Sequence, residues 1–293
     1  MTRRFALLVN PTAAGGRALA RLPAVTAELD RLGAPHRVVR TRGIDHAREE
    51  ARSAVAAGET VAAMGGDGFL RPIAGELAGT EGALAVIPGG RGNDFARVLD
   101  IPPDPAGAAR VAVEGRERRL DIAEANGEPY IGIASFGFDS ECNRIANETK
   151  LIRGNLVYFY SALRAIATWK PAAFTVDVDG EVHEFRGWSV AVANSRAFGG
   201  GMFLAPHAEL DDGILEVVTI SETSKLAYVR DLPKVFKGEH LDNPAVGLLR
   251  GERVTVSADR PFDVYADGDP VASLPATMTV RRQALRVIVP AGD

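Results

Sequence analysis

The first half of the chain alternates short apolar runs with segments in which apolar residues recur at helical spacing. Leu19, Leu22 and Val25, for example, continue this spacing to Leu32, where Gly33 ends it. Strands are predicted at 5–9, 36–41, 60–64 and 84–88, and helices at 19–32, 45–57, near 70–78 and through Phe95 and Leu99. Strands that alternate with helices predict a parallel sheet in a layered α/β domain.

In the second half of the chain, apolar and polar residues alternate with a period of two. Residues 173–185 alternate apolar and polar side chains around Asp179-Gly180, which predicts a hairpin with a two-residue turn. Further strands are predicted at 188–195, 213–220, 252–258, 261–269 and 284–290, and helices near 155–169 and 223–237. We therefore predict an α/β domain at 1–120 and a β-rich domain at 121–293, and the sequence leaves open whether the last strand returns to the first domain.

Composition narrows the class of protein. The 293 residues are enough for about two domains, and 46% hydrophobic with 25% charged residues excludes disorder and collagen. No apolar run approaches the roughly 18 residues of a membrane-spanning helix, and the first one stops at Asn10-Pro11, too early for a signal peptide. We expect a cytoplasmic protein. Its net charge of −4 with scattered arginines argues against a nucleic-acid partner.

Glycine-bearing loops follow three of the predicted parallel strands: Asn10–Gly16, Gly65-Gly66-Asp67-Gly68, and Pro88–Asp94. The carboxyl ends of parallel strands share one sheet edge, where ligands of such sheets bind. Glycines let the backbone approach a phosphate, a helix amino terminus supplies amides, and a carboxylate can hold Mg²⁺. A tight turn with Asp67 as a helix cap is the structural alternative. Lys150 is the first lysine, so the amino-terminal half has no P-loop lysine.

Two acidic segments of the second half are ambiguous. Asp267 stands in Tyr265-Ala266-Asp267-Gly268-Asp269, where Asp-Gly is most simply a hairpin turn. Asp211-Asp212-Gly213 predicts either a turn or a hard-cation site completed by neighbouring carbonyls.

Taken in order, these segments resemble the diacylglycerol kinase catalytic family, soluble bacterial lipid kinases with sphingosine-kinase-like members. The resemblance implies a Rossmann-like α/β nucleotide domain and a carboxyl-terminal β-sandwich, with ATP and lipid meeting between them. It rests on NPTAAGG at 10–16, Thr41, GGDG at 65–68, PGGRGNDFAR at 88–97, ASFGFD at 134–139, the segment 192–217 with FGGGM and DDG, and ADGD at 266–269.

The resemblance implies ATP and Mg²⁺ as cofactors and assigns roles to individual residues. Asp67 and Asp94 would organise Mg²⁺, and Asp267 would be the general base for the lipid hydroxyl. A second, structural Mg²⁺ would bind the Asp212 side chain and the carbonyls of Glu209 and Ile214. Besides Asp67 and Asp94, the implied nucleotide-binding residues are Asn10, Pro11, Thr12, Thr41, Gly65, Gly66, Gly68, Gly90, Arg91 and Asn93.

The chain departs from the family pattern at the nucleotide site. Phe69 replaces the threonine of GGDGT, Arg71-Pro72 replace an Asn-Glu pair, and Arg91 replaces the threonine of the third loop. Either the arginines contact phosphate, since a guanidinium offers a bidentate fork, or the site has lost its activity.

Three functions are therefore weighed. The leading hypothesis is an ATP- and Mg²⁺-dependent lipid kinase acting on diacylglycerol or a related lipid. The alternatives are a non-catalytic nucleotide- or lipid-binding pseudokinase and an NAD kinase, which shares GGDG. For the lipid kinase we expect peripheral contact with the inner face of the membrane, where the lipid is presented, and a possible homodimer. The sequence does not identify the lipid.

Overall fold

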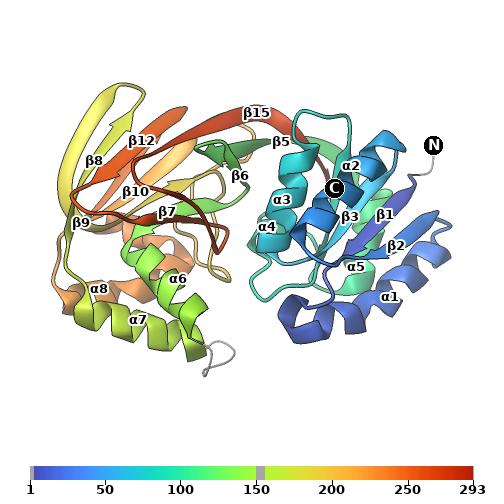
Figure 1. The fold of residues 1–293 in the computed structure, drawn as a ribbon, viewed down its shortest axis with the longest axis horizontal. Helices are drawn as coiled ribbons and strands as arrows, with labels where there is room; N and C mark the ends of the chain where they lie inside the picture. Colours follow the sequence, from blue (N-terminus) through green and yellow to red (C-terminus); the bar gives the residue numbers. More distant parts are fainter. Residues whose placement is uncertain (1–2, 150–155, 293) are drawn as a thin grey trace.

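The amino-terminal half is built on four parallel strands. β1 (Phe5–Val9), β2 (His36–Arg40), β3 (Thr60–Gly65) and β4 (Ala83–Pro88) lie in the order β2-β1-β3-β4, with Val9 opposite Met64 and Gly65 opposite Pro88. The computed structural model describes residues 3–149 and 156–292. Every residue of β1 and β4 is buried, as expected for strands covered on both faces. The predicted parallel sheet is confirmed (Figure 1).

Helices cover both faces of this sheet. α1 (Arg17–Arg31) packs against α5 (Pro105–Glu114) on one face, and α2 (Ile44–Ala56) packs against α3 (Asp67–Leu77) on the other. A 3₁₀ turn (Ala13–Gly16) precedes α1, and the short α4 (Asp94–Val98) follows the third glycine loop. α1 turns Ala18, Leu22, Val25 and Leu29 inward, the periodicity that predicted it.

The helix α5 was not predicted. Its inward side chains are Ala108, Ala109 and Ala112, so its apolar periodicity is weak in the sequence. The structure shows what begins it: Asp104 accepts a hydrogen bond from the Gly107 amide at 2.6 Å, and Pro105 occupies the first turn. The proline-rich stretch at 102–105 therefore starts a helix of the α/β half and is not the point where that half ends.

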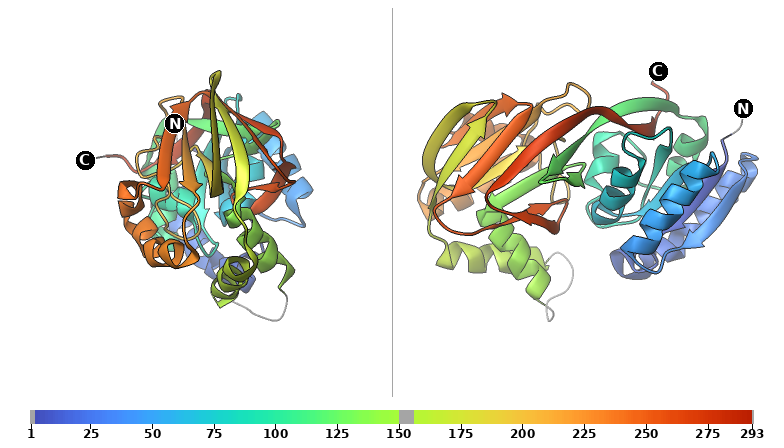
Figure 2. Two further views of the ribbon diagram at one scale, coloured as in Figure 1. Left: turned by 90° about the vertical axis from the view of Figure 1, so that its left-hand side faces the viewer. Right: turned by 45° about the horizontal axis from the view of Figure 1, so that its top comes forward.

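The carboxyl-terminal half is β-rich, as predicted, and packs around its own apolar cluster, which includes Phe136, Phe174 and Val217. The predicted class, an α/β half followed by a β-sandwich-like half, is confirmed (Figures 1 and 2). The strands of the carboxyl-terminal half are β5 (Arg116–Ala125), β6 (Glu128–Tyr130), β7 (Ile133–Gly137), β8 (Ala172–Val178), β9 (Glu181–Ala193), β10 (Leu215–Ser221), β11 (Val246–Gly251), β12 (Arg253–Ala258), β13 (Asp263–Ala266), β14 (Asp269–Ser273) and β15 (Ala276–Val289).

Helices lie at one end of these strands. α6 (Phe138–Glu148) was not predicted, whereas α7 (Leu156–Thr168) was. The helix predicted over 223–237 is split into α8 (Lys225–Asp231) and the 3₁₀ segment η2 (Leu232–Lys237), with η3 (Glu239–Asp242) after it. Pro233 explains the split, because it lacks the amide that an α-helix would need there. None of the described helices is both long and apolar enough to cross a membrane.

The predicted hairpin at Asp179-Gly180 joins β8 to β9. Both turn residues have positive φ, 51° and 93°, as a two-residue turn that follows the twist of the strands requires. The Asp179 carboxylate also accepts hydrogen bonds from the amides of Glu252 and Arg253 at 3.0 and 2.9 Å, which attaches the turn to the next hairpin.

Two long antiparallel strands, β5 and β15, run through both halves of the molecule (Figures 1 and 2). β15 pairs with β12 at Met278 and in parallel with β4 at Ile288, so the last strand belongs to both sheets. The division predicted near residue 120 falls inside β5.

The β5–β15 ladder is interrupted between Arg281 and Leu285. The buried carboxylate of Asp121 lies at this point and accepts hydrogen bonds from the amides of Gln283 and Gly213 at 2.6 and 2.7 Å. Burial raises the pKa of Asp121, and these two amides oppose that shift. One carboxylate therefore satisfies the backbone where the connecting strands lose their regular pairing.

Candidate active site

The first glycine loop begins where β1 ends, beside β3. The amide of Asn10 donates to the Met64 carbonyl at 3.0 Å, and the Asn10 side-chain oxygen accepts from the amide and hydroxyl of Thr12 at 3.1 and 2.9 Å. The chain leaves β1 and β3 on opposite sides of the sheet, which is the position where such sheets bind ligands. Thr41 is buried there, and its hydroxyl donates to the Val9 carbonyl at 3.0 Å.

The second and third loops touch through their backbones. A Cβ placed on Gly90 would lie 2.4 Å from the Cα of Gly66. Asn93 closes the third loop on itself, because its side chain accepts from the Gly90 amide at 2.7 Å and donates to the Gly90 carbonyl at 3.2 Å. Gly66 and Gly90 therefore allow the backbones of the two loops to touch, and the Asn93 side chain fixes the conformation of the third loop.

Asp67 and Asp94 lie next to each other at this edge. Asp67 accepts hydrogen bonds from the amides of Asp94 and Phe95 at 3.0 and 3.1 Å, so it caps α4 and not the helix that it begins. Asp94 accepts from the Gly200 amide at 2.7 Å, and its other carboxylate oxygen is buried without a hydrogen-bond partner. Burial raises the pKa of Asp94, and the charge of Asp67 adds to the shift.

This pair fits a Mg²⁺ ion. Mg²⁺ is commonly held by one or two carboxylates together with waters and substrate phosphates. The Asp94 oxygen that accepts no hydrogen bond supplies a ligand position, with the Arg97 guanidinium 3.8 Å from it, and a cation would relieve the repulsion between the carboxylates. Among the described residues there is no cluster of three or more His, Cys, Asp or Glu side chains suited to a metal, so the remaining ligands would have to come from water and phosphate.

Asp267 reaches this edge from the other half of the molecule. It stands at the tip of the β13–β14 hairpin with φ of 52°, so the simple turn interpretation is correct. Its carboxylate accepts hydrogen bonds from the amides of Ile131 and Gly132 at 3.0 and 2.9 Å. Burial raises the pKa of Asp267 to about 7, although the Ile131 and Gly132 amides oppose the shift.

The hairpin tip lies against the amino terminus of α3. A Cβ placed on Gly68 would lie 2.8 Å from an Asp269 carboxylate oxygen and 3.7 Å from the Asp267 carbonyl oxygen. The sequence motif ADGD contains Asp269, but only the fold shows that its side chain reaches α3. The amides that hold Asp267 carry no side-chain signal, so the sequence could not indicate them.

The three departures from the family pattern lie in different surroundings. The Phe69 ring is buried against Gly65, where an added Cβ would meet it at 2.5 Å. The Arg71 guanidinium lies 3.8 Å from the Asp269 carboxylate and donates to the Pro129 carbonyl at 3.5 Å, and its Nε is buried without a hydrogen-bond partner. Arg91 is exposed and has no hydrogen bond or ion pair with any residue that the structure describes.

The second metal position inferred from the resemblance lies elsewhere in the carboxyl-terminal half. One oxygen of Asp212 accepts from the Arg250 guanidinium at 2.9 Å, and the other accepts from the Ile214 amide at 2.9 Å. The neighbouring carboxylate of Glu216 is buried without a hydrogen bond, with Arg250 Nε 3.5 Å away. Arg250 thus supplies positive charge beside Asp212, and a structural Mg²⁺ held with the Glu209 and Ile214 carbonyls stays a prediction.

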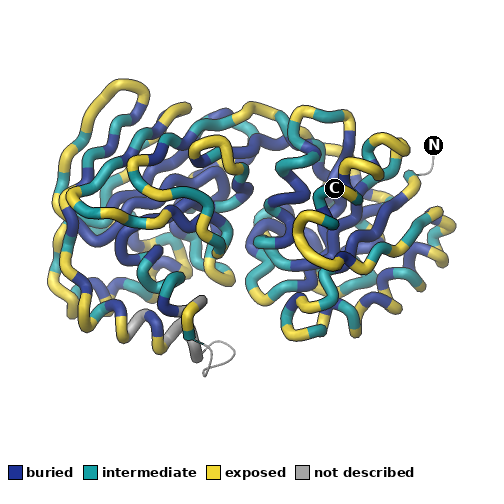
Figure 3. The backbone as a smooth tube through the Cα atoms, in the orientation of Figure 1, coloured by how far each residue is buried: buried dark blue, intermediate teal, exposed yellow. Residues whose placement is uncertain are grey.

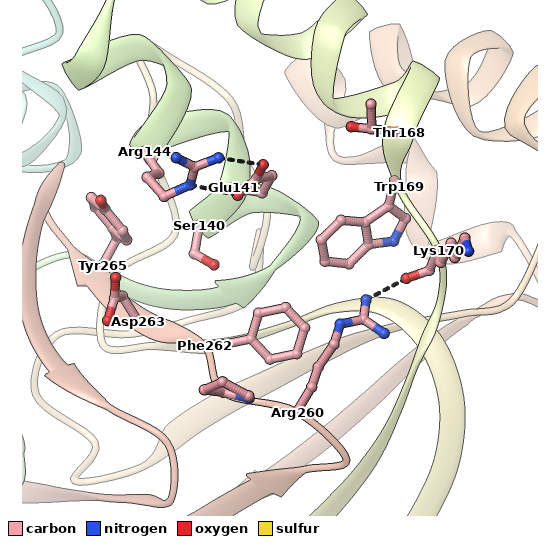
Figure 4. Close-up of a pocket in the computed structure, with 11 residues that line it drawn as sticks. Ser140, Glu141, Arg144, Thr168, Trp169, Lys170, Arg260, Phe262, Asp263 and Tyr265 are labelled. Carbon is pink, nitrogen blue, oxygen red and sulfur yellow. Dashed lines mark hydrogen bonds and ion pairs between the residues drawn. The ribbon is translucent and has the colours of Figure 1, made fainter.

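A cavity of about 530 Å³ opens between α6, the end of α7 and β13. Aromatic side chains and charged ones of both signs line it (Figure 4): Trp169, Phe262 and Tyr265 on the one hand, and Glu141, Arg144, Arg260 and Asp263 on the other. Tyr265 is two residues before Asp267 on the same hairpin. A cavity with aromatic and charged walls therefore lies on the hairpin that carries Asp267.

Comparison with known proteins matches both halves. Residues 4–125 match the family model "Diacylglycerol kinase catalytic domain", and residues 132–289 match "YegS C-terminal NAD kinase beta sandwich-like domain". A diacylglycerol kinase of Mycobacterium tuberculosis is 33% identical, over 97% of this chain and 94% of its own length. A probable lipid kinase YegS-like protein of Pseudomonas aeruginosa is 32% identical, over 84% and 82%.

Solved structures show the same fold. One from Bacillus anthracis superimposes with a TM-score of 0.84 at 22% identity, covering 99% of this chain and 96% of that one. A second, described as a diacylglycerol kinase from the same organism, has a TM-score of 0.78 at 21% identity, covering 99% and 98%.

The loop contact generates a prediction. Gly90→Ala should lower the free energy of unfolding by about 1–3 kcal/mol, because its methyl group meets the Gly66 backbone, which has no rotamer to change. Thermal denaturation would measure this. Gly68→Ala is the matched control: its methyl group meets only the end of the Asp269 side chain, and alanine favours the helix. Equal stability of Gly90→Ala and wild type would contradict the loop contact.

Proposed function

The chain belongs to the diacylglycerol kinase catalytic family and is a lipid phosphotransferase, and on that premise we propose that it transfers the γ-phosphate of ATP to a hydroxyl of diacylglycerol or a related lipid. The observation that carries this proposal is the meeting of two elements from different halves: the amino terminus of α3, with Asp67 and Asp94, and the hairpin tip with Asp267. Phosphoryl transfer needs mainly positioning and charge stabilisation, which such a meeting can supply.

The nucleotide side of the site would be the sheet edge of the amino-terminal half. The first amides of α3 have no acceptor within the helix and carry the positive end of its dipole, which favours phosphate. The direct contact between Gly66 and Gly90 leaves little side-chain bulk between these amides and a bound nucleotide. Asp67 and Asp94 would hold Mg²⁺, which when bound would neutralise charge on the phosphate oxygens.

Asp267 would be the general base. The oxygen of the lipid hydroxyl forms a bond to the γ-phosphorus, its proton passes to the Asp267 carboxylate, and the bond to the β–γ bridging oxygen breaks to release ADP. The two amides orient the carboxylate, and its raised pKa of about 7 suits proton transfer near neutral pH.

The surroundings of the three departures from the family pattern favour an active site with altered phosphate contacts over a site that has lost its activity. The Phe69 ring packs beneath Gly65 as part of the apolar core of the amino-terminal half, so the change from threonine adds a core contact there. Arg71 keeps a buried, unpartnered donor beside the hairpin tip, and Arg91 is exposed on the third loop. We propose that both arginines contact phosphate, Arg71 from its position beside the hairpin tip and Arg91 from the exposed third loop. No feature of the site favours a pseudokinase, and the match of 4–125 to the diacylglycerol kinase model favours lipid over NAD as the acceptor.

The cavity beside Tyr265 would hold the apolar part of the lipid. Its aromatic lining suits hydrocarbon, and β13 leads from it directly to Asp267. A hydroxyl at the head of a lipid held there would come close to the proposed base. The product, a phosphorylated lipid, would enter phospholipid biosynthesis.

The base assignment is tested by Asp267→Asn. Removing the proton acceptor should lower kcat by about 10²–10⁴-fold, while the Kd of nucleotide changes by no more than a few fold. Phosphate transfer from labelled ATP to a panel of detergent-dispersed lipids, with and without Mg²⁺, would measure kcat. Calorimetric titration with nucleotide would measure the Kd. Asp259→Asn, at an exposed carboxylate in the loop before β13, is the control. Parallel loss of binding and turnover would count against the base role.

The pH dependence gives a second test. Because only the ionised carboxylate accepts a proton, kcat/KM should fall as the pH drops through about 7. Arg71 lowers the pKa of Asp267 through its charge, so Arg71→Met should move this acid limb to higher pH. Arg91→Met should leave the limb in place. An acid limb unmoved by Arg71→Met would show that Arg71 does not act on the base.

A further inference from the structure

The outward side of α8 and η2 carries apolar side chains that are exposed among the residues that the structure describes. Leu226, Val229 and Phe236 are 82%, 42% and 51% exposed. Their spacing continues along one helical face, while Tyr228, Asp231 and Val235 point inward and are buried. Single exposed apolar residues are ordinary, but three along one face of a short segment form a patch.

The same face is basic in an acidic protein. Lys225, Arg230, Lys234 and Lys237 alternate with the three apolar residues and are all exposed. Three of the five lysines of the chain lie within residues 225–237. Residues 225–238 contain these four basic side chains and one acidic one, a net charge of +3 in a chain of −4. We call these four basic and three apolar residues the α8 face.

The one acidic residue does not reach the outside. Asp231 is buried, and its carboxylate accepts hydrogen bonds from Arg230 at 2.9 Å and from the Asn243 amide group at 3.0 Å, with Lys234 3.0 Å away. The Asp231 carboxylate therefore pairs, from the inward side of the segment, with the side chains of Arg230 and Lys234. The outward side of residues 225–237 carries no carboxylate, and exposed Glu222 and Glu239 lie just beyond its two ends.

The α8 face is held rigidly on the sandwich. The Tyr228 ring stacks on Trp188 with a centroid distance of 4.2 Å, and Trp188 Nε1 donates to the Thr223 carbonyl at 3.1 Å. Lys225 donates to the Ala167 carbonyl at 2.9 Å, which joins the face to the end of α7. α7 and α8 lie together at the lower end of the carboxyl-terminal half in Figure 1.

This position connects the α8 face to the cavity. The residues that follow Ala167, from Thr168 to Lys170, line the cavity of Figure 4, where Arg260 stands over the Trp169 ring. In Figure 3 the backbone of the carboxyl-terminal half carries exposed segments at the end where α7 and α8 lie, and Leu226 and Phe236 are among the exposed residues.

We propose that the α8 face docks the protein on an anionic lipid surface. Leu226, Val229 and Phe236 would enter the interface between headgroups and acyl chains, and the four cations would meet lipid phosphates, as amphipathic interfacial helices do. A lipid surface as the partner rests on the proposed function, because a lipid kinase must meet its substrate at a membrane. Docking in this orientation brings the cavity to the lipid from which its occupant comes.

Co-sedimentation with vesicles in the absence of ATP tests the proposal. Wild type should bind vesicles of phosphatidylcholine with phosphatidylglycerol, and raised salt should weaken binding. Leu226→Ser with Phe236→Ser should reduce the partition coefficient about tenfold or more. Lys234→Gln with Lys237→Gln should reduce it about tenfold on anionic vesicles and little on phosphatidylcholine alone.

Matched controls change equivalent side chains elsewhere. Val182→Ser removes a 57% exposed apolar side chain at the opposite end of the sandwich, and Arg17→Gln with Arg21→Gln removes two exposed cations of α1. Both controls should bind vesicles as wild type does. Circular dichroism of each variant confirms that it folds.

The outcomes separate docking from catalysis. Docking variants should keep the wild-type rate on a short-chain diacylglycerol in solution and lose rate on lipid embedded in vesicles. Vesicle binding that depends on the α8 face, without transfer to any lipid, would support docking and overturn the kinase proposal. Docking would be overturned if wild type failed to bind anionic vesicles, if the α8 variants bound like the controls, or if their only effect were dissociation of a dimer.

Discussion

The β5–β15 ladder is the constraint on which the site depends. A nucleotide edge in one half and an acidic hairpin in the other can meet only if the two halves are held in one orientation. Both strands run through both halves, β15 also pairs with β4, and Asp121 satisfies the amides where the ladder is interrupted. Two paired strands side by side resist rotation that a single flexible linker would allow. The position of Asp267 against α3 follows from this geometry.

Backbone amides hold all three site carboxylates. Asp67 is held by the start of α4, Asp94 by Gly200, and Asp267 by the strand region at Ile131 and Gly132. Amides stabilise the ionised form without neutralising it, so they offset part of the cost of burial and leave the negative charge available. Burial, together with the smaller effect of the Asp67 charge, raises the pKa of Asp94 and Asp267, which suits the binding of a cation at Asp94 and of a proton at Asp267.

The two halves divide the proposed work. The amino-terminal half offers helix amides and paired carboxylates, which suit phosphate and Mg²⁺. The carboxyl-terminal half offers the proposed base, a cavity with aromatic and charged walls, and the α8 face, which suit a lipid with its hydroxyl at one end. The Gly200 loop crosses between them and bonds to Asp94, so the contact between the halves is itself part of the site.

Local pattern determined the parallel strands of the first half, most of its helices and the hairpin at Asp179, because periodicity and turn chemistry act over a few residues. Together with the family resemblance, it also indicated which carboxylates to examine. It missed the helices α5 and α6 and the strands β5, β6, β7 and β11. For α5 the reason is that an alanine-lined face gives a weak periodic signal. Only the tertiary structure decided that Asp67 caps another helix, that Phe69 turns into the core while Arg71 faces the hairpin, and that α8 leaves its apolar side uncovered. Each of these depends on contacts between residues distant in the chain, and the strand pairing that creates those contacts is not encoded in any one segment.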